Sequence, residues 1–271
     1  MEVLDITADE YFERDEVSNS MLKDFRDKGP WTYYHKYIKR GQPEPEATKS
    51  MKLGSAFHAL MADGDDFSQS IAVQPPTIRG KPTNLRLKAH REYMKQFELG
   101  HKGKIILAPD EIDQLLRMRE SVFDNPAAAV FAAQLEPKRS EVVALENIAG
   151  VNCKAMCDAD FSDQGVIIDF KTTRHHLGRE FARDAFYKFG YHFQAAHYCD
   201  VFHAERFLFV AVRNFAPYES LVLEIPEHLI GQARMINHQT LDRIRWCHDM
   251  GDWHTDGWGV TVDLEDMINN D

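Results

Sequence analysis

The sequence predicts an α/β fold in which a mixed central sheet is flanked by helices. The first observation is that apolar residues between about 18 and 135 recur mainly at helical spacing. The second is a change of period to two between residues 141 and 170, which is typical of strands joined by short turns. The third is that helical and strand-like segments alternate from there to about residue 250. A chain of 271 residues is long enough for one good-sized domain.

Helices are expected in the N-terminal part of the chain. The segment 18–28 begins with capping serines, places apolar residues at helical spacing and ends at Gly29-Pro30. A second helix over 49–62 contains Gly54, which allows a neighbouring element to approach closely. A loop is expected over 41–47, and a basic loop from 74 leads into a helix that runs to about 98. Another helix is expected over about 109–125, followed by a shorter, alanine-rich helix that runs to about 135.

The sheet is expected to begin with a three-strand meander. The strands are predicted over 141–147, 150–161 and 166–170, with a turn at Asp163-Gln-Gly165 between the last two. The elements that follow are helices over 179–188 and 191–202, strands over 206–212 and 221–225, and a long helix over 226–250. Only Asp169 interrupts the apolar character of the third strand, so a charge stands where a buried element reaches its end.

Net charge gives no direct indication of a nucleic-acid partner. The chain carries a formal charge of −11, whereas phosphate binding usually requires a basic surface. The stretch from 79 to 91 is locally basic and contains no acid, so we consider it a candidate for DNA-backbone contact, with a solvated helix face as the alternative. Its cations are Arg79, Lys81, Arg86, Lys88 and Arg91.

Other composition features limit the class of protein. No window approaches the roughly 18 consecutive apolar residues of a membrane span. The acidic start, MEVLDITADEYFER, has no apolar run, so we expect no signal peptide and no membrane partner. The four cysteines form no CxxC pair, which favours reduced thiols in a cytosolic protein.

The most informative unit is Asp158, followed eleven residues later by Asp169-Phe170-Lys171. Strands joined by a tight turn pair antiparallel, so both carboxylates can reach one end of the sheet, and residues i and i+2 share a face. Converging carboxylates repel unless a cation lies between them, and hard oxygen ligands suit Mg²⁺ or Mn²⁺. A nearby lysine can orient or deprotonate a water that attacks a phosphodiester. The alternative is two solvent-facing acids and an ordinary surface lysine.

The succession GSAFH, SEVVAL, CDADF, VIIDFKTT and GYHFQAAHY resembles the RecE-type exonucleases (exonuclease VIII), often phage- or prophage-borne, of the PD-(D/E)xK superfamily. The resemblance covers roughly residues 18–213 and implies a restriction-endonuclease-like core. It implies that Asp158 and Asp169 bind metal together with the carbonyl of Phe170, and that Lys171 is the catalytic lysine. His58 matches an upstream metal ligand or near-ligand, and Gln194 and Tyr198 match a pair on the helix behind the site.

Each assignment has a structural alternative. His58 could be a satisfied core histidine, Gln194 a surface amide and Tyr198 a packing aromatic. Glu141 begins the first strand and either assists a metal or is a solvated strand end. Asp160 shares a strand face with Asp158, and the spacing to Asp169 decides for Asp158. Cys157 replaces the proline of the superfamily name, at a position that is often degenerate.

The segment 18–30 also resembles the entry helix of several nucleases in this superfamily. In the iron–sulfur branch a cysteine precedes the proline of this segment, and three more cysteines lie near the C-terminus. Here Gly29 precedes Pro30 and only Cys247 lies late in the chain. We therefore expect no iron–sulfur cluster.

The resemblance implies a Mg²⁺-dependent exodeoxyribonuclease that degrades linear double-stranded DNA 5′→3′ and leaves 3′ tails. It also implies a single-strand annealing protein as partner, a homo-oligomeric ring (trimer or tetramer) and the cytoplasm of a bacterial host. The alternatives are a structure-specific endonuclease of the same superfamily and an inactive DNA-binding or scaffold protein. We expect one nuclease domain over 1–271, with a helical part at about 1–135, a core at about 136–250 and an aromatic, then acidic, tail at 251–271.

Overall fold

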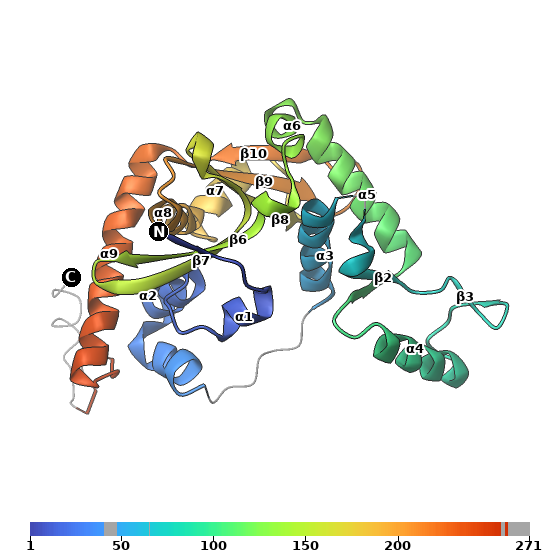
Figure 1. Ribbon diagram of the computed structural model, residues 1–271, viewed down its shortest axis with the longest axis horizontal. Helices are drawn as coiled ribbons and strands as arrows, with labels where there is room; N and C mark the ends of the chain where they lie inside the picture. The colour runs from blue at the N-terminus through green and yellow to red at the C-terminus, as the bar shows by residue number, and fades with distance from the viewer. Residues whose placement is uncertain (41–47, 65, 256–257, 260–271) are drawn as a thin grey trace.

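A computed structural model of the protein describes residues 1–40, 48–64, 66–255 and 258–259 (Figure 1). Its centre is a six-stranded sheet in the order β1-β6-β7-β8-β9-β10. Strands β8 and β9 are parallel and the other neighbours are antiparallel. The predicted α/β fold with a mixed sheet flanked by helices is therefore confirmed. The strands are β1 (Glu2–Leu4), β6 (Ser140–Ile148), β7 (Val151–Phe161), β8 (Val166–Thr173), β9 (Arg206–Arg213) and β10 (Ser220–Glu224).

Helices cover both faces of the sheet, and each face has its own apolar core. One core joins the sheet to α2 (Asn19–Tyr33), α8 (Tyr191–Phe202) and α9 (Glu227–Met250), with residues such as Leu22 and Phe207 fully buried. The other joins it to α3 (Lys49–Asp63), α5 (Pro109–Asp124) and α6 (Pro126–Ala132). Two buried faces explain why β8 and β9 are nearly continuous apolar runs.

The chain enters its first long helix as the capping residues predict. The Ser18 hydroxyl accepts a hydrogen bond from the amide of Met21, and Gly29 leaves the helical conformation at φ 81°. Pro30 then begins a further helical segment that runs into a π-helix over Tyr34–Ile38. The predicted stop at Gly29 is thus a kink rather than an end.

Several short elements carry too little periodicity for the sequence to predict them. They are α1 (Ala8–Glu13), β2 (Ile71–Val73), β3 (Thr77–Ile78), β4 (Lys81–Pro82), β5 (Ile105–Leu107) and the 3₁₀ turns Phe67–Gln69 and Pro137–Arg139. The turn predicted at Asp163-Gln-Gly165 is confirmed as a 3₁₀ turn over Ser162–Gln164. Strands β2 and β5 pair in parallel although about 30 residues separate them. The hairpin β3–β4 and helix α4 (Lys88–Gly100) project from this small sheet at the right of Figure 1, and we call them the arm.

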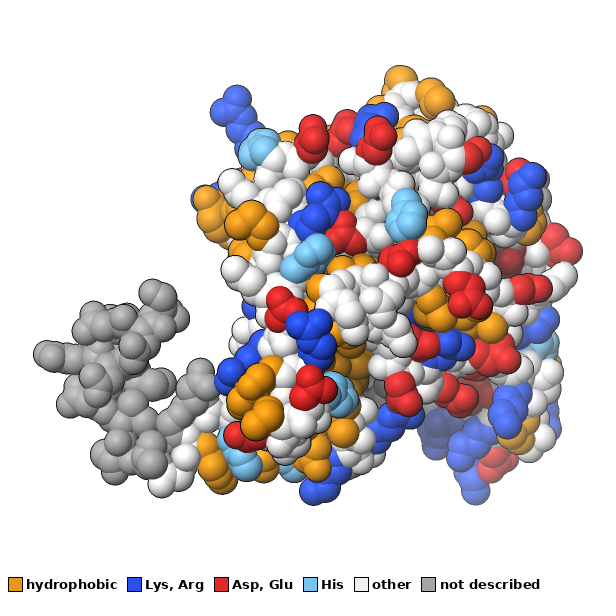
Figure 2. All heavy atoms as spheres, turned by 60° about the vertical axis from the view of Figure 1, so that its left-hand side comes forward, with side chains coloured by type: hydrophobic (Ala, Val, Ile, Leu, Met, Phe, Trp, Pro, Cys, Tyr) orange, Lys and Arg blue, Asp and Glu red, His pale blue; other side chains and the backbone are white. Residues whose placement is uncertain are grey.

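The remaining helix, α7 (Arg179–Tyr187), lies between β8 and α8 in the chain. The expected loop over 41–47 and the acidic end of the expected tail lie outside the described residues. Among the helices that the structure describes, none is long and apolar enough to cross a membrane. Acidic and basic side chains lie interspersed on the face in Figure 2, so the negative net charge does not form one acidic patch there.

Candidate active site

The hydrogen-bonded ladders on both sides of β7 are interrupted at Asp158. The ladder with β6 pairs Ser140 with Ala159 and Val142 with Cys157, and it skips the position between them. The ladder with β8 ends at Ala159–Ile168, so the next step of the register sets Asp158 opposite Asp169. There the Asp158 carboxylate accepts a hydrogen bond of 2.6 Å from the Phe170 amide. The antiparallel pairing predicted across the turn is confirmed, and it brings the two acids to the same point.

Helix α3 brings His58 to this point. A methyl group added at Gly54 would lie 3.4 Å from the Thr172 hydroxyl, so the helix passes close to the end of β8. Phe57, one residue before His58, packs edge-on against Phe170 with ring centroids 6.2 Å apart. The ring of His58 then lies with Nε2 at 2.8 Å from the Phe170 carbonyl oxygen and Nδ1 at 3.3 Å from Asp158 Oδ1. His58 therefore contacts two of the oxygens that the sequence predicts as metal ligands.

Asp169 is held by two side chains from different elements. Its side chain is only 7% exposed and forms an ion pair with Lys171, its neighbour on the same strand face. The other carboxylate oxygen accepts a hydrogen bond from the side-chain amide of Gln194 on α8. The structure thus brings Gln194 into direct contact with one of the predicted acids.

Tyr191 is a residue of this site that the sequence analysis did not single out. The Lys171 ammonium lies 5.8 Å from the centroid of the Tyr191 ring and 5.6 Å from that of Phe209. These two rings stack on each other at 4.3 Å. Gly190 has a left-handed backbone at φ 66°, and it turns the chain so that α8 begins with Tyr191. The signal was present in the motif GYHFQAAHY, where Tyr191 precedes Gln194 by one helical turn.

The electrostatics of the site follow from two acids in a partly enclosed place. Burial raises the pKa of Asp158 to about 6, and the negative charge of Asp169 adds to the rise, while His58 and Lys171 oppose it. Burial alone would lower the pKa of Lys171, but the charges of Asp169 and Asp158 outweigh it and the net shift is upward. Lys171 is therefore a cation in the presence of both carboxylates.

The other predicted residues lie near the site with fewer contacts. Tyr198 packs its ring against Phe202 and Phe207, at centroid distances of 6.4 and 5.6 Å, and burial raises the pKa of its hydroxyl well above the usual value.

Glu141 lies on β6 in the position opposite Asp158; it is exposed and has a left-handed backbone at φ 51°. Such a conformation is uncommon for residues other than glycine and is found at functional sites.

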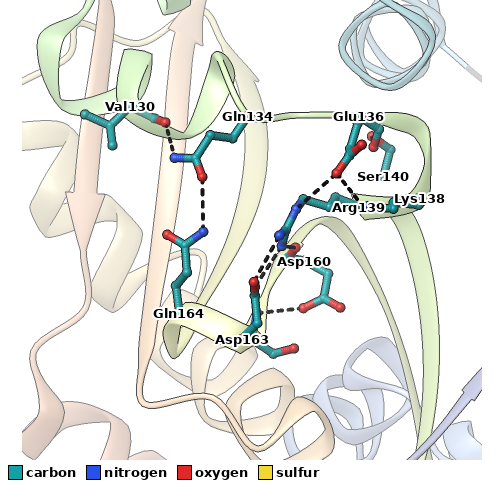
Figure 3. Close-up of polar contacts among 10 residues, drawn as sticks. Val130, Gln134, Glu136, Lys138, Arg139, Ser140, Asp160, Asp163 and Gln164 are labelled. Carbon is teal, nitrogen blue, oxygen red and sulfur yellow. Dashed lines mark hydrogen bonds and ion pairs between the residues drawn. The ribbon is translucent and has the colours of Figure 1, made fainter.

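Asp160, the runner-up to Asp158, is fixed at the turn after β7. Its carboxylate accepts a hydrogen bond of 2.8 Å from the Ser162 amide, and its carbonyl accepts one of 3.0 Å from Arg139. Arg139 also binds both carboxylate oxygens of Asp163, at 2.7 and 3.0 Å (Figure 3). The Asp160 carboxylate thus caps the 3₁₀ turn.

The basic stretch 79–91 lies on the arm. All five of its cations are exposed: Arg79, Lys81, Arg86, Lys88 and Arg91. The Arg91 guanidinium donates to the carbonyls of Leu85 and Arg86, at 3.1 and 2.8 Å, and so also stabilises the loop before α4. Lys88 lies 3.8 Å from Glu92.

The oxygen donors at the point where β8 leaves β7 fit a hard divalent cation. Among the described residues there is no cluster of three or more His, Cys, Asp or Glu side chains with metal-site geometry. Mg²⁺ does not require one, because it is commonly bound by one or two carboxylates and retains several waters. Asp158, Asp169 and the carbonyl of Phe170 supply oxygen atoms only, and in this structure the side chains of His58 and Lys171 face those oxygens. The four cysteines are free and buried.

A helix-flanked mixed sheet with two acids and a lysine at the point where two adjacent strands diverge defines a PD-(D/E)xK-like domain. The chain matches the family described as "PDDEXK-like domain of unknown function (DUF3799)" over residues 18–256. Because the match spans most of its length, the chain belongs to this family. Family membership supports a nuclease function for the protein.

One solved structure supports this fold. A protein from Eubacterium rectale named "Putative exonuclease" has a TM-score of 0.59 at 13% sequence identity, over 98% of this chain and 99% of that chain. The structure of SSO0001 has a TM-score of 0.30 at 16% identity, over 83% of this chain and 84% of that chain, and this value is too low to carry an argument. No curated protein is significantly similar in sequence.

Proposed function

We propose that the protein is a Mg²⁺-dependent exodeoxyribonuclease that hydrolyses phosphodiesters in linear double-stranded DNA. The observation that carries the proposal is the convergence of Asp158, Asp169 and Lys171 with His58 and Gln194 at the point where β8 leaves β7. These side chains come from β7, β8, α3 and α8, and a merely solvated hairpin does not require such a set of contacts.

The proposed roles follow from the contacts. Asp158, Asp169 and the Phe170 carbonyl hold Mg²⁺, which Mn²⁺ can replace. When bound, the metal activates a water as nucleophile and neutralises charge on the phosphate. Lys171 orients that water or offsets the developing negative charge. His58 fixes the positions of two ligand oxygens, and Gln194 fixes the Asp169 carboxylate through the contact described above.

Three further assignments are part of the proposal. Tyr198 follows Gln194 by four residues on α8, so it belongs to the same helical face, and together with Gln194 it contacts a phosphate or the attacking water. Glu141, opposite Asp158, assists a metal. The cations of the arm contact the DNA backbone away from the reacting phosphate; they are Arg79, Lys81, Arg86, Lys88 and Arg91.

The exonuclease assignment is supported by the RecE-type motifs and by the name of the Eubacterium rectale neighbour. On the same support we propose a single nuclease domain, 5′→3′ polarity with 3′ tails, and a bacterial cytoplasmic location. The proposal includes a single-strand annealing partner and a homo-oligomeric ring. In a ring the outer surface can be acidic while the channel collects basic residues, which accommodates the −11 charge.

One assay separates the proposal from its alternatives. Linear, nicked and closed circular duplexes are incubated with Mg²⁺ and the wild type, Lys171→Ala or Lys102→Ala, an exposed lysine in the turn after α4. We expect digestion of linear DNA only, a loss of about 10²- to 10⁴-fold in Lys171→Ala, and wild-type rates in Lys102→Ala.

The outcomes have distinct meanings. Digestion of closed circles would favour the structure-specific endonuclease. Equal digestion by Lys171→Ala would overturn the site assignment, and no digestion by the wild type would favour the scaffold. End-labelled linear DNA then determines polarity.

A further inference from the structure

Arg213 is a buried cation that the proposed mechanism does not use. It ends β9, and its side chain is 8% exposed. A guanidinium has five N–H donors in a fixed planar arrangement, and buried charges are normally paired and hydrogen-bonded. Its nearest carboxylate is that of Glu219, at 4.0 Å, and its other neighbour is the ring of Phe215, at 4.1 Å from the centroid. Its Nε has no hydrogen-bond partner among the described residues.

The sheet register places Arg213 beside the candidate active site. Strands β8 and β9 are parallel, with Lys171 paired to Ala211 and Thr173 to Arg213. Residues two apart in a strand share a face, so Arg213 lies on the same face as Asp169 and Lys171, about 6.6 Å further along the strand. The amide of Asn214 donates to the Thr173 carbonyl at 2.9 Å, which holds the two strand ends together beyond this point.

A second cation follows at the neighbouring strand end. Arg174 is the residue after β8 and is exposed to solvent. Its charge opposes the upward shift that Glu111 produces in the pKa of Lys49, so Arg174 lies near the start of α3 and not beside Arg213. Arg213 is therefore the arginine on the face of Lys171 at the carboxyl end of the parallel strand pair, and ligands of α/β sheets characteristically bind outside such ends.

We propose that Arg213 forms a phosphate-binding subsite next to the catalytic residues. It takes the phosphate of the DNA that neighbours the phosphate at Lys171. The inference rests on the proposed function. A phosphate offers two oxygens to which a guanidinium can donate in a bidentate arrangement, and its charge would balance a buried cation whose nearest carboxylate lies 4.0 Å away. The phosphate is either an internal diester or a terminal group of a linear duplex.

The test compares Arg213→Gln with two matched controls. Glu219→Gln and Phe215→Leu change the two other neighbours of the guanidinium and leave the arginine in place. We expect Arg213→Gln to raise KM for linear duplex DNA about tenfold with kcat little changed, because it removes binding shared by ground and transition states. The slope of log K against log salt should fall by about 0.9, the value for one phosphate contact.

Other substrates and variants separate phosphate binding by Arg213 from a contribution to folding. Hydrolysis of thymidine 5′-(p-nitrophenyl phosphate), which carries a single phosphate, should be unchanged in Arg213→Gln. If Arg213→Gln has a lower Tm, Arg213→Lys, which keeps the charge and loses the bidentate geometry, should give an intermediate KM at wild-type Tm. Linear duplexes with 5′-phosphate and with 5′-hydroxyl ends separate the two sources. If Arg213 binds a terminal phosphate, Arg213→Gln abolishes the difference in KM between these two substrates. If it binds an internal phosphate, Arg213→Gln raises KM equally for both.

Two results would overturn the subsite. One is a wild-type KM and salt slope in Arg213→Gln; the other is an equal loss in Glu219→Gln, which would show that the arginine serves the β9–β10 turn. A wild type that cleaves no DNA would instead refute the proposed function. Fluorescence anisotropy of labelled duplex without metal then still decides the subsite, because equal affinities of wild type and Arg213→Gln would refute it.

Discussion

His58→Ala is expected to raise the Mg²⁺ concentration needed for half-maximal DNA cleavage by roughly 2- to 5-fold. The imidazole contacts the Phe170 carbonyl oxygen at 2.8 Å and Asp158 Oδ1 at 3.3 Å. With both nitrogens facing acceptors, the ring holds two proposed ligand oxygens in a fixed relation. Alanine removes that constraint, so the oxygens must be ordered by the metal itself.

The magnitude follows from the geometry of the two contacts. The 2.8 Å contact lies within the normal hydrogen-bond range, whereas 3.3 Å lies just beyond it, so one contact dominates. The Phe170 carbonyl is neutral, and a hydrogen bond between neutral groups contributes about 0.5–1.5 kcal/mol net. At about 1.4 kcal/mol per factor of ten, its loss corresponds to roughly 2- to 12-fold in an equilibrium constant. The His58 side chain is 30% exposed, so water replaces part of the interaction and the lower half of this range is expected.

The assay is cleavage of linear duplex as a function of Mg²⁺ concentration, with Tm measured in parallel. His228→Ala, at an exposed position on α9, is the control and should follow the wild-type curve. A wild-type Mg²⁺ requirement combined with a large loss of Tm would refute the reasoning, because it would make His58 a core histidine that only packs and satisfies its neighbours.

Three other substitutions test separate parts of the structure. Lys154→Ala should lower the free energy of unfolding by about 2–5 kcal/mol in urea titration, because the buried ammonium donates to the carbonyls of Tyr11 and Arg14 at 2.6 and 2.7 Å; a loss below about 1 kcal/mol would contradict this. Burial pushes the pKa of Asp24 up, but hydrogen bonds from two lysines and a tyrosine outweigh it and lower the pKa to about 2. The stability that Asp24 provides is therefore complete above its unfolded pKa of 3.8 and is lost as pH falls through about 2. Asp24→Asn should cost about 1–2 kcal/mol at pH 7 and flatten the wild-type fall in stability between pH 4 and pH 2, and an unchanged pH profile would exclude this origin. Tyr191→Leu should lower kcat about tenfold while Tyr191→Phe retains activity, because the ring face and not the hydroxyl lies over Lys171, the proposed catalytic lysine; equal losses in both variants would contradict it.

The parts of the fold that the sequence predicts are those with local periodicity. The strand pair β7–β8 and helix α8 were predicted within a few residues because alternation, a glycine turn and helical spacing are all properties of short windows. Strand β1 has three residues at the start of the chain and pairs with β6 in the middle of it, so no short window of sequence could reveal this strand. The same holds for β2 and β5, whose parallel pairing depends on tertiary contacts alone.

For the candidate site, the sequence predicts which residue types meet but not how. Motif spacing predicts that Asp158, Asp169 and Lys171 meet, and the register and the ion pair agree with that. They meet where β8 leaves β7 and not at the strand end, because β8 runs on to Thr173 beside β9. The interruption of the ladders at Asp158 and the hydrogen bond from the Phe170 amide to its carboxylate depend on strand bending, which has no local signature. Arg213 likewise looks like an ordinary strand end in the sequence, because only the parallel register with β8 sets it beside the acids.

The choice between Asp158 and Asp160 shows where local chemistry could have strengthened the sequence argument. Both lie on one strand face, and spacing alone favoured Asp158. Yet an aspartate two residues before a serine that opens a turn can accept a hydrogen bond from the backbone N–H of that serine. This local hydrogen bond competes with any role of the carboxylate as a metal ligand. In the structure Asp160 makes this bond with Ser162 at 2.8 Å, whereas the carboxylate of Asp158 extends across to β8. The turn therefore engages one acid and leaves the other to face Asp169, so turn chemistry and motif spacing independently select the same residue.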